Sequence, residues 1–361
     1  MSGGYRRPRV LAIASARPRG HKRGVRNPLN IGGVRVPGRV FAAPMTGVTD
    51  LPFRRLVFGL GAAYAATEMV ACAELARGRP DVVRRAAVGE GLPLMAVQLV
   101  GREAAWLARG ARLAADAGAE IVDLNMGCPA REVTGGLSGS ALMRDLDHAE
   151  SLIAAAVGAT DRPVTLKMRL GWDDAGRNAP ELAERAERAG VKAVTVHGRT
   201  RMQFYKGAAD WSAVAAVKAA TRLPVIVNGD VTDLLTAREA LRRSGADAVM
   251  IGRGLYGRPW LAAQIEAALA GEPEPAEPGA EARLAIVVRH LRSSLAFYGD
   301  RLGLKVFRKH LGWYVERAPW PETPEARRAA KAGLCRLETG REVEQALARL
   351  WLGAEVSALA A

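Results

Sequence analysis

Cys128 stands on a predicted loop whose neighbours also carry amide and carboxylate groups. The stretch 123–129 reads Asp-Leu-Asn-Met-Gly-Cys-Pro, and the apolar run Ile121 to Leu124 predicts a buried strand before the loop. Loops at the carboxyl ends of strands are where α/β proteins place their chemistry. A thiol at such a place is suited to giving or taking one proton. Free cysteines are otherwise often small buried apolar residues, and we expect that role for Cys72 and Cys335, which lie among alanines and leucines.

Polar or small residues also follow the other predicted strands. In a closed barrel the loops after the strands share one mouth, so these residues are expected to gather into one site. In chain order they are Pro44, Met45, Thr46 and Gly47, then Glu68, Gln98, Asn125, Lys167, Arg169, His197, Gly198, Arg199, Asn228, Gly229, Asp230, Gly252, Arg253 and Gly254.

The last two predicted loops are suited to holding a phosphate. In barrels of this kind the loops after strands seven and eight are the usual phosphate site, where backbone N–H groups face the anion. Gly229 and Gly252 let the backbone approach closely, and Arg253 adds a bidentate donor. The segment 252–257 also fits the pattern GxGxxG. It follows the last strand instead of opening the first βαβ unit, which argues against a dinucleotide fingerprint and favours a mononucleotide phosphate.

Lys167 lies on a predicted barrel strand between apolar neighbours. An ammonium there can serve as a Schiff-base nucleophile or as a fixed positive charge beside a cofactor ring. Gln98 and His197 add further polar groups at the same mouth. Together the three favour the pyrimidine edge of a flavin.

Eight apolar, β-branched runs alternate with amphipathic, alanine-rich stretches of helical period, after an opening hairpin around Ile31 to Val36. Eight alternations over ~220 residues favour a (β/α)8 TIM barrel over an open doubly wound sheet. The expected helices include Glu103 to Ala117, Ala179 to Ala189 and Asp233 to Arg243. The expected strands are Val40 to Ala43, Ala63 to Thr67, Leu94 to Leu99, Ile121 to Leu124, Val164 to Met168, Ala193 to Val196, Val225 to Val227 and Ala248 to Ile251.

The pattern changes after the barrel. We expect a basic, disordered extension over 1–30, the catalytic barrel over 31–270, and a linker rich in proline and glutamate over 271–280. Residues 281–361 show only helical periodicity, which predicts a small helical bundle. One of its helices carries Lys305, Arg308, Lys309 and His310 beside Trp313 and Tyr314. Such a basic face suits a nucleic-acid backbone, although a solvated charged face is the commoner meaning.

The composition narrows the class of protein. The formal charge of the 361 residues is +15, and the eight basic residues of 1–30 leave +7 on the remainder. A basic body favours polyanionic partners, although an arginine-rich composition can also follow from coding bias. Three cysteines without a CxxC pair argue against a structural metal or a disulfide framework and favour a reducing compartment. No apolar run has the ~20 residues of a membrane span, so we expect a cytoplasmic protein.

Several motifs in fixed order resemble the tRNA-dihydrouridine synthases, and most closely their bacterial B-type, nitrogen-regulation-like branch. The resemblance runs from about residue 30 to about residue 320. The basic extension has no counterpart in it, and Thr46 stands where alanine is common. The motifs are Ala43 to Asp50, Phe53-Arg54, Asn125 to Pro129, Gly139 to Leu142, His197 to Thr200, Asn228 to Asp230, Gly252-Arg253 and Arg308 to His310.

The resemblance implies an FMN enzyme that reduces the C5–C6 double bond of uridine in tRNA, with NADPH as electron donor and no stable protein partner. It implies that Cys128 is the general acid. FMN would be held by Pro44, Met45, Thr46, Gln98, Lys167, His197, Asn228, Gly229, Asp230, Gly252 and Arg253. The nucleotide and the tRNA would be contacted by Asn125, Arg169, Arg199, Lys305, Arg308, Lys309 and His310.

Three other functions fit parts of the pattern. An FMN barrel reductase of a small molecule, similar to dihydroorotate dehydrogenase, also pairs a flavin with a loop cysteine but needs no basic helical domain. An aldolase with Lys167 as Schiff-base nucleophile would lack a flavin. A non-catalytic RNA-binding protein on the same barrel would not depend on Cys128.

Overall fold

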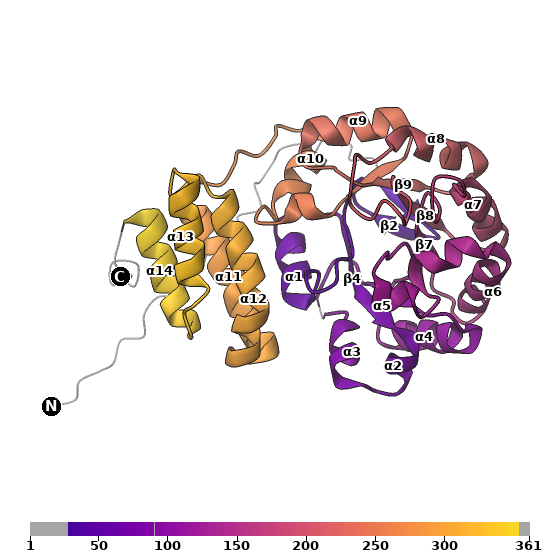
Figure 1. Cartoon of the computed structure of the whole chain (residues 1–361), viewed down its shortest axis with the longest axis horizontal. Helices are drawn as coiled ribbons and strands as arrows, with labels where there is room; N and C mark the ends of the chain where they lie inside the picture. The colour runs from indigo at the N-terminus through magenta and orange to yellow at the C-terminus, as the bar shows by residue number, and fades with distance from the viewer. Residues whose placement is uncertain (1–27, 90, 354–361) are drawn as a thin grey trace. The chain divides into compact units, whose positions relative to one another are not determined.

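A computed structural model describes residues 28–89 and 91–353. The basic extension expected over 1–30 therefore lies almost wholly outside the described residues. The chain divides into two compact units whose boundary in the sequence falls between Ala276 and Glu277. The first unit contains every described strand, and the second contains only helices among its described residues (Figure 1).

The first unit is a closed barrel of eight parallel strands, which confirms the predicted (β/α)8 fold. Pairing runs in chain order, and the last strand closes on the first with Met250 opposite Phe41. Figure 1 shows the strands inside a ring of helices. The strands are β3 (Val40–Ala42), β4 (Tyr64–Ala71), β5 (Ala96–Val100), β6 (Ile121–Met126), β7 (Val164–Arg169), β8 (Ala193–His197), β9 (Val225–Asn228) and β10 (Ala248–Ile251).

Four helices of the barrel begin at an aspartate that satisfies one of their first N–H groups. The side chains of Asp50, Asp145, Asp210 and Asp233 each accept a hydrogen bond from a backbone N–H in the first turn. The helices are α1 (Leu51–Gly59), α2 (Cys72–Ala76), α3 (Pro80–Arg85), α4 (Ala104–Asp116), α5 (Arg131–Thr134), α6 (Leu146–Val157), α7 (Ala179–Arg188), α8 (Trp211–Ala220), α9 (Leu234–Ser244) and α10 (Leu261–Leu269), with 3-10 turns η1 (Gly139–Arg144) and η2 (Arg253–Leu255).

The predicted hairpin precedes the barrel. Strand β1 (Leu29–Ile31) pairs antiparallel with β2 (Val34–Val36), with Leu29 opposite Val36. Gly32 and Gly33 turn the chain with φ of 57° and 94°, which a residue with a side chain rarely adopts.

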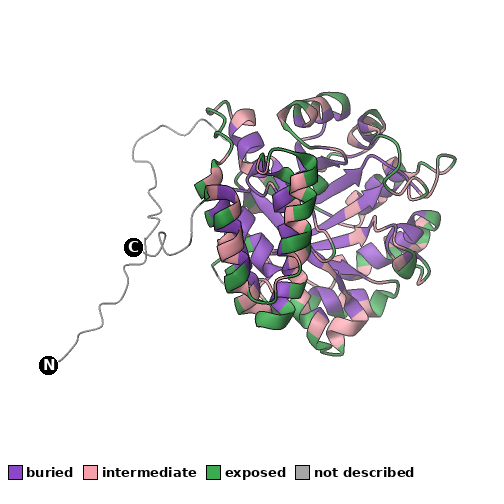
Figure 2. Ribbon diagram, turned by 60° about the vertical axis from the view of Figure 1, so that its left-hand side comes forward, coloured by how far each residue is buried: buried purple, intermediate pink, exposed green. Residues whose placement is uncertain are grey.

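Most of the buried residues are apolar, and Figure 2 shows buried positions along the barrel strands and in parts of the helices. Every residue of β5, β8, β9 and β10 is buried. This two-sided burial explains why these strands are nearly continuous apolar runs in the sequence. The polar residues that interrupt them therefore point into the barrel or lie at its mouth.

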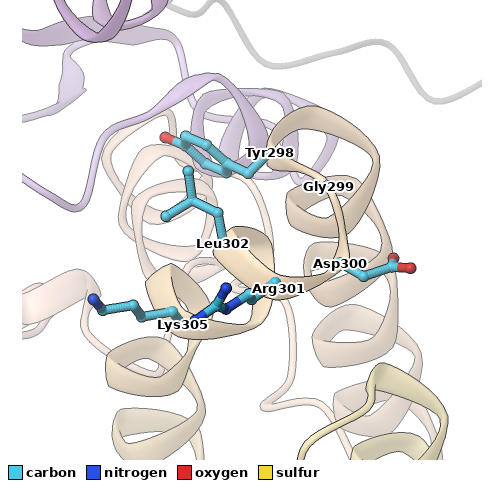
Figure 3. A pocket seen from close by; sticks show the side chains of 6 residues that line it. All are labelled: Tyr298, Gly299, Asp300, Arg301, Leu302 and Lys305. Atoms are coloured by element: carbon cyan, nitrogen blue, oxygen red, sulfur yellow. The ribbon is translucent and has the colours of Figure 1, made fainter.

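The second unit contains α11 (Ala280–Tyr298), α12 (Asp300–Arg317), α13 (Pro324–Leu334) and α14 (Gly340–Leu352). Gly299, with φ of 80°, separates α11 from α12. A pocket of about 480 Å³ lies at this corner. Figure 3 shows Asp300 pointing away from Leu302 and Lys305. An aromatic, an aliphatic, an acidic and two basic side chains line the pocket. It is lined by Tyr298, Gly299, Asp300, Arg301, Leu302 and Lys305.

Candidate functional site

The carboxyl ends of the barrel strands bring the predicted site residues to one mouth. Asn125 pairs with Lys167 across β6 and β7, and Arg169 pairs with His197 across β7 and β8. His197 in turn pairs with Asn228 on β9. These register positions place amide, ammonium, guanidinium and imidazole groups near the carboxyl ends of four successive strands.

The loop that carries Cys128 is held from both sides. The Asn125 Oδ1 accepts hydrogen bonds from the backbone N–H groups of Gly127 at 3.2 Å and Cys128 at 3.0 Å. On the other side, the Ser140 hydroxyl donates to the Cys128 carbonyl oxygen at 2.8 Å, and the Ser140 N–H donates to it at 3.1 Å. Gly139 has φ of 60°, and a Cβ there would lie 2.9 Å from that carbonyl oxygen. The loop is thereby fixed in one conformation.

The thiol of Cys128 is half-buried. Burial raises its pKa above the ordinary value of 9.0, although the positive charges of Arg169 and Lys167 act in the opposite direction. The thiol is therefore protonated at neutral pH. This favours a proton donor over a thiolate nucleophile.

Lys167 on β7 is directed into the mouth and bonded to Asn228 on β9, the second strand along. Its Nζ donates to the Oδ1 of Asn228 at 3.1 Å, and the Nδ2 of Asn228 donates to the Met250 carbonyl oxygen at 2.8 Å. Burial first, and the nearby Arg169 second, lower the pKa of Lys167 to about 8. Lys167 is therefore a desolvated cation that gains from any anionic or electron-rich group brought beside it.

A carboxylate and two guanidinium groups follow strands β8, β9 and β10. The two oxygens of Asp230 accept from Arg199 Nη1 at 2.9 Å and Arg199 Nη2 at 2.5 Å, and Asp230 also meets Arg253 at 3.3 Å. Asp230 has φ of 53°, an uncommon backbone conformation for a residue with a side chain. The Arg253 side chain stays 52% exposed and keeps donors for an anion at the mouth.

His197 is buried and neutral. Burial first, and then the positive charges of Arg169, Lys167, Arg199 and Arg253, lower its pKa well below 6.5. A Cβ on Gly229 would lie 2.8 Å from the His197 ring, so only glycine permits the backbone after β9 to pass this imidazole.

The loop after β3 is held by buried polar groups. Thr49 Oγ1 accepts from the Met45 N–H at 2.9 Å, and the Glu68 carboxylate accepts from the Gly47 N–H. Glu68 is 4% exposed. Pro44 and Met45 are half-buried, while Thr46 is exposed.

Arg169 and Arg199 require a correction to the expectation that they reach the nucleotide. Each is only 1% exposed. Arg169 donates to the carbonyl oxygens of Gly127, Thr200 and Phe204 at 2.8 to 2.9 Å. Arg199 donates to the carbonyl oxygens of Lys206 and Gly207 as well as to Asp230. Both guanidinium groups therefore fix loops of the mouth, a use that strand-end position alone does not distinguish from ligand binding.

His310 and Cys335 in the helical unit also differ from expectation. His310 was expected on the basic face of its helix, but it is 3% exposed and its ring lies 4.6 Å from that of His290. Lys305 and Lys309 are exposed, whereas Arg308 is half-buried and donates to the Leu337 carbonyl oxygen at 3.3 Å. Cys335 is half-buried, not part of the core, while Cys72 is buried as expected.

Two further residues in and near the mouth were given no role in the sequence analysis. Tyr205 is 53% exposed and lies between the guanidinium groups of Arg169 and Arg253, which are 5.6 and 4.9 Å from its ring centre. No periodic signal marks this residue, because it stands in a loop. Asp123 is buried in β6 and bonded to Gln98 and Thr165. It stands two residues before Asn125, so strand alternation was a signal that both face the barrel interior.

The donor set at the mouth fits a flavin mononucleotide. Lys167 is a desolvated cation beside amide groups, His197 is a neutral imidazole, and Arg253 is an exposed guanidinium beside glycines. A Cβ on Gly252 would meet no atom closer than 3.7 Å, so the chain there leaves room for a group to approach the backbone. Among the described residues, no group of three or more acidic, histidine or cysteine side chains is placed to hold a metal ion. In the same part of the chain, no helix is long and apolar enough to cross a membrane.

Comparison with known proteins gives a consistent result. The family model described as "Dihydrouridine synthase (Dus)" matches residues 41–351. A probable tRNA-dihydrouridine synthase of Rhodobacter capsulatus is 55% identical over 303 residues, 83% of this chain and 93% of that protein. One from Rhizobium leguminosarum is 51% identical and covers 90% of this chain and 98% of that protein. The tRNA-dihydrouridine synthase B of Pseudomonas aeruginosa is 42% identical over 81% of this chain and 88% of its own.

Solved structures support the barrel fold alone. Histamine dehydrogenase from Rhizobium sp. 4-9 matches 75% of this chain with a TM-score of 0.52 and 14% identity. A 2-naphthoyl-CoA reductase matches 69% with a TM-score of 0.54 and 12% identity. This chain spans about half the length of these solved chains, 51% and 52% respectively.

Proposed function

Because the chain belongs to the dihydrouridine synthase family, we propose that it reduces the C5–C6 double bond of uridine in tRNA, with FMN as redox group and NADPH as electron donor. Relatives named tRNA-dihydrouridine synthase cover most of the chain at 42 to 55% identity. They favour this function over reduction of a small molecule.

One observation supports the chemistry most strongly. The protonated thiol of Cys128 lies on a hydrogen-bonded loop at the barrel mouth. Lys167, a desolvated cation, and the pair Gly252-Arg253 lie at the same mouth. A proton donor serves the reduction of uracil, and a cation for an electron-rich ring and an anion site serve the binding of a flavin mononucleotide.

The residues proposed to hold FMN divide by chemistry. Lys167 and His197 face the ring, and Asn228 orients Lys167. Gln98, which the sequence also predicted at the ring, is only 1% exposed, and its amide is engaged by Asp123 and Asn125. The loop Pro44 to Thr46 lies beside the ring, and Gly229, Gly252 and Arg253 receive the phosphate. Asp230 holds Arg253 and Arg199 in place through its two oxygens. FMN, when bound, supplies a hydride for uracil C6.

Cys128 supplies the second hydrogen. Its Sγ–H donates a proton to uracil C5, so that one hydride and one proton together saturate the double bond. The raised pKa of Cys128 keeps this proton in place until C5 becomes basic. The thiolate left behind is stabilised by the positive charges of Arg169 and Lys167 and regains its proton from solvent. Asn125 orients the uracil edge through the second hydrogen of its Nδ2.

The helical unit is proposed to bind tRNA. The target uridine must leave its stack to enter the barrel mouth, so binding energy has to come from contacts elsewhere on the tRNA. Lys305 and Lys309 expose their ammonium groups on one helix, and Arg301 and Lys305 line the pocket of Figure 3 beside Tyr298. Cations beside an aromatic ring suit a phosphate backbone and an unstacked base. A tRNA substrate also implies that the protein acts in the cytoplasm.

Mapping dihydrouridine in tRNA from cells with and without the gene tests this function. Specific uridines are expected to lose the modification without the gene and to regain it when the wild-type gene, but not Cys128→Ala, is restored. Unchanged maps would contradict the function. Oxidation of NADPH by the purified flavoprotein with a small pyrimidine, but not with tRNA, would favour the reductase of a small molecule.

A further inference from the structure

Asp123 is a buried carboxylate inside the barrel to which the proposed reaction gives no role. It is 4% exposed and pairs in register with Gln98 on β5 and Thr165 on β7. Thr165 Oγ1 donates to its Oδ1 at 2.7 Å, and Gln98 Nε2 donates to its Oδ2 at 2.6 Å. Burial raises the pKa of Asp123 to about 6, so keeping this charge costs free energy. A function of Asp123 in the site would explain why a charged carboxylate is kept in the barrel interior.

The hydrogen bonds of Asp123 determine how two side-chain amides are turned. A carboxylate only accepts, so Gln98 must turn its NH₂ toward Asp123 and its Oε1 away. That Oε1 accepts from Asn125 Nδ2 at 2.8 Å, which leaves Asn125 Oδ1 facing the loop. Asn125 Oδ1 in turn accepts from the N–H groups of Gly127 and Cys128. Asp123 therefore determines which group donates and which accepts in each of these successive hydrogen bonds.

We propose that Asp123 is a positioning residue for proton donation: acting through Gln98 and Asn125, it holds the backbone of Cys128 so that the thiol meets uracil C5. This inference rests on the proposed function. If the Gln98 amide turned over, its NH₂ would face the Asn125 NH₂. Asn125 would then turn its own NH₂ toward two backbone N–H groups and lose both bonds to the loop.

Two substitutions separate this role from that of a buried charge. Asp123→Leu removes every acceptor from the position, so Gln98 loses the partner that orients it. Asp123→Asn removes the charge but keeps one oxygen for Gln98 Nε2, because its NH₂ can face Thr165, whose hydroxyl is able to accept. The positioning role predicts that asparagine rescues what leucine loses. A role through the charge, for example on Lys167, predicts that both variants fail alike.

The experiment follows one turnover of the reduced flavoprotein with tRNA, measuring both flavin oxidation and dihydrouridine. We expect Asp123→Leu to slow this step about 10- to 100-fold, the cost of misplacing a reacting group by about 1 Å. Reduction of the flavin by NADPH needs no proton from Cys128 and is expected to change less than about threefold. Asp123→Asn should stay within about fivefold of wild type in both steps.

A second readout does not depend on the flavin. Alkylation of Cys128 by iodoacetamide, followed by mass spectrometry of its peptide, reports how firmly the loop shields the thiol. Asp123→Leu should speed alkylation of Cys128 at pH 8 at least about threefold, with Asp123→Asn close to wild type. Glu266→Gln is the matched control, because Glu266 is also a buried carboxylate, 2% exposed, and accepts the N–H of Val40 at the opposite end of the strands. It should change neither readout.

If Asp123→Leu does not fold, Asp123→Asn with Thr165→Val replaces it. Valine cannot accept from the Asn NH₂, so the new amide has no fixed orientation and turnover should fall at least about tenfold below Asp123→Asn alone. The proposal is overturned if Asp123→Leu matches wild type in both readouts, or if Asp123→Asn fails as badly as Asp123→Leu. Absence of dihydrouridine with the wild-type enzyme would instead overturn the proposed function itself.

Discussion

The barrel mouth and the core of the helical unit both bury ionisable side chains, but with different partners. In the barrel, the half-buried Lys167 on β7 bonds to the Asn228 amide on β9, and the buried Asp123 on β6 bonds to Gln98 and Thr165 on the two adjacent strands. In the helical unit, His290 and His310 pack against Phe307 and each other, and His290 shares a hydrogen bond with Tyr314 at 3.0 Å. Hydrogen bonds from neighbouring polar groups allow Asp123 and Lys167 to remain ionisable near neutral pH. Packing among aromatic rings keeps His290 and His310 uncharged.

The pKa values express the same contrast. Those of Asp123 and Lys167 move to about 6 and about 8, within reach of neutral pH. Burial lowers the pKa of His290 to about 3 and that of His310 well below 6.5, so neither carries a charge in the folded protein at neutral pH. The perturbed groups of the mouth are thus suited to chemistry, and those of the helical unit to packing.

Replacing Lys167 by methionine should give the largest effect on ligand binding. Loss of one charge-assisted contact is expected to weaken FMN binding about 10- to 100-fold. The same change should stabilise the flavin-free protein at pH 7 by about 1 to 3 kcal/mol, because a lysine whose folded pKa is lowered destabilises the fold while charged. This gain should vanish as pH rises from about 8 to 10.5. Flavin titration and urea unfolding measure both, with the exposed Lys192→Met as control.

Charge reversal on the helical unit should affect tRNA and leave the flavin alone. Lys305→Glu with Lys309→Glu is expected to weaken tRNA binding about tenfold at low salt and to reduce the salt dependence by about two phosphate contacts. Filter binding across a salt series measures this, and Lys305→Arg with Lys309→Arg is the matched control. An unchanged salt slope would show that these lysines are only a solvated face.

Acid should weaken the helical unit through its two histidines. Their folded pKa values lie below the unfolded value of 6.5, so the unfolded chain binds more protons and stability is lost as pH falls below 6.5. The expected slope is at most about 1.4 kcal/mol per pH unit for each histidine. Urea unfolding at pH 7 and pH 5 measures it, and His310→Leu should remove about half of the slope. A slope that His310→Leu leaves unchanged would place the acid sensitivity elsewhere.

Cys335→Ser should give the smallest effect. The thiol is half-buried, and its sulfur lies 3.7 Å from the Arg308 carbonyl oxygen, a contact that a hydroxyl can keep. The free energy of unfolding should change by less than about 0.5 kcal/mol. A loss above about 2 kcal/mol would instead mark the core position that the sequence analysis expected.

Strand period and strand-end position were enough to predict the barrel and most of its mouth. Because all eight strands of such a barrel run parallel, the residues that follow each apolar run must lie at the same end of the barrel. The use of each polar group was harder to predict, because Arg169 and Arg199 are distinguished from ligand-binding residues only by the carbonyl oxygens that surround them. The contacts of Arg169 join segments 31 to 42 residues apart in the sequence, and those of Arg199 close the loop that follows β8. Neither kind of contact follows a strand or helix period.

The helical period of the sequence would have corrected the prediction that His310 lies on the exposed face of its helix. Phe307, His310, Leu311 and Tyr314 recur at the i, i+3, i+4 and i+7 spacing of one helix face, and all four are buried. Lys305 and Lys309 lie on the other side and are exposed. The basic residues of this helix therefore lie on two different faces. Only the face with Lys305 and Lys309 is available to an RNA backbone.

The central claim is that Cys128 donates a proton and does not hold the flavin. Its most direct test is one turnover of NADPH-reduced Cys128→Ala with tRNA, measured beside the flavin content of the same preparation. We predict normal flavin content, normal reduction by NADPH, and dihydrouridine formation at least about 100-fold slower than in wild type, the contribution typical of a general acid. Dihydrouridine formation within about threefold of the wild-type rate would contradict the account, because a proton donor cannot be removed at so small a cost.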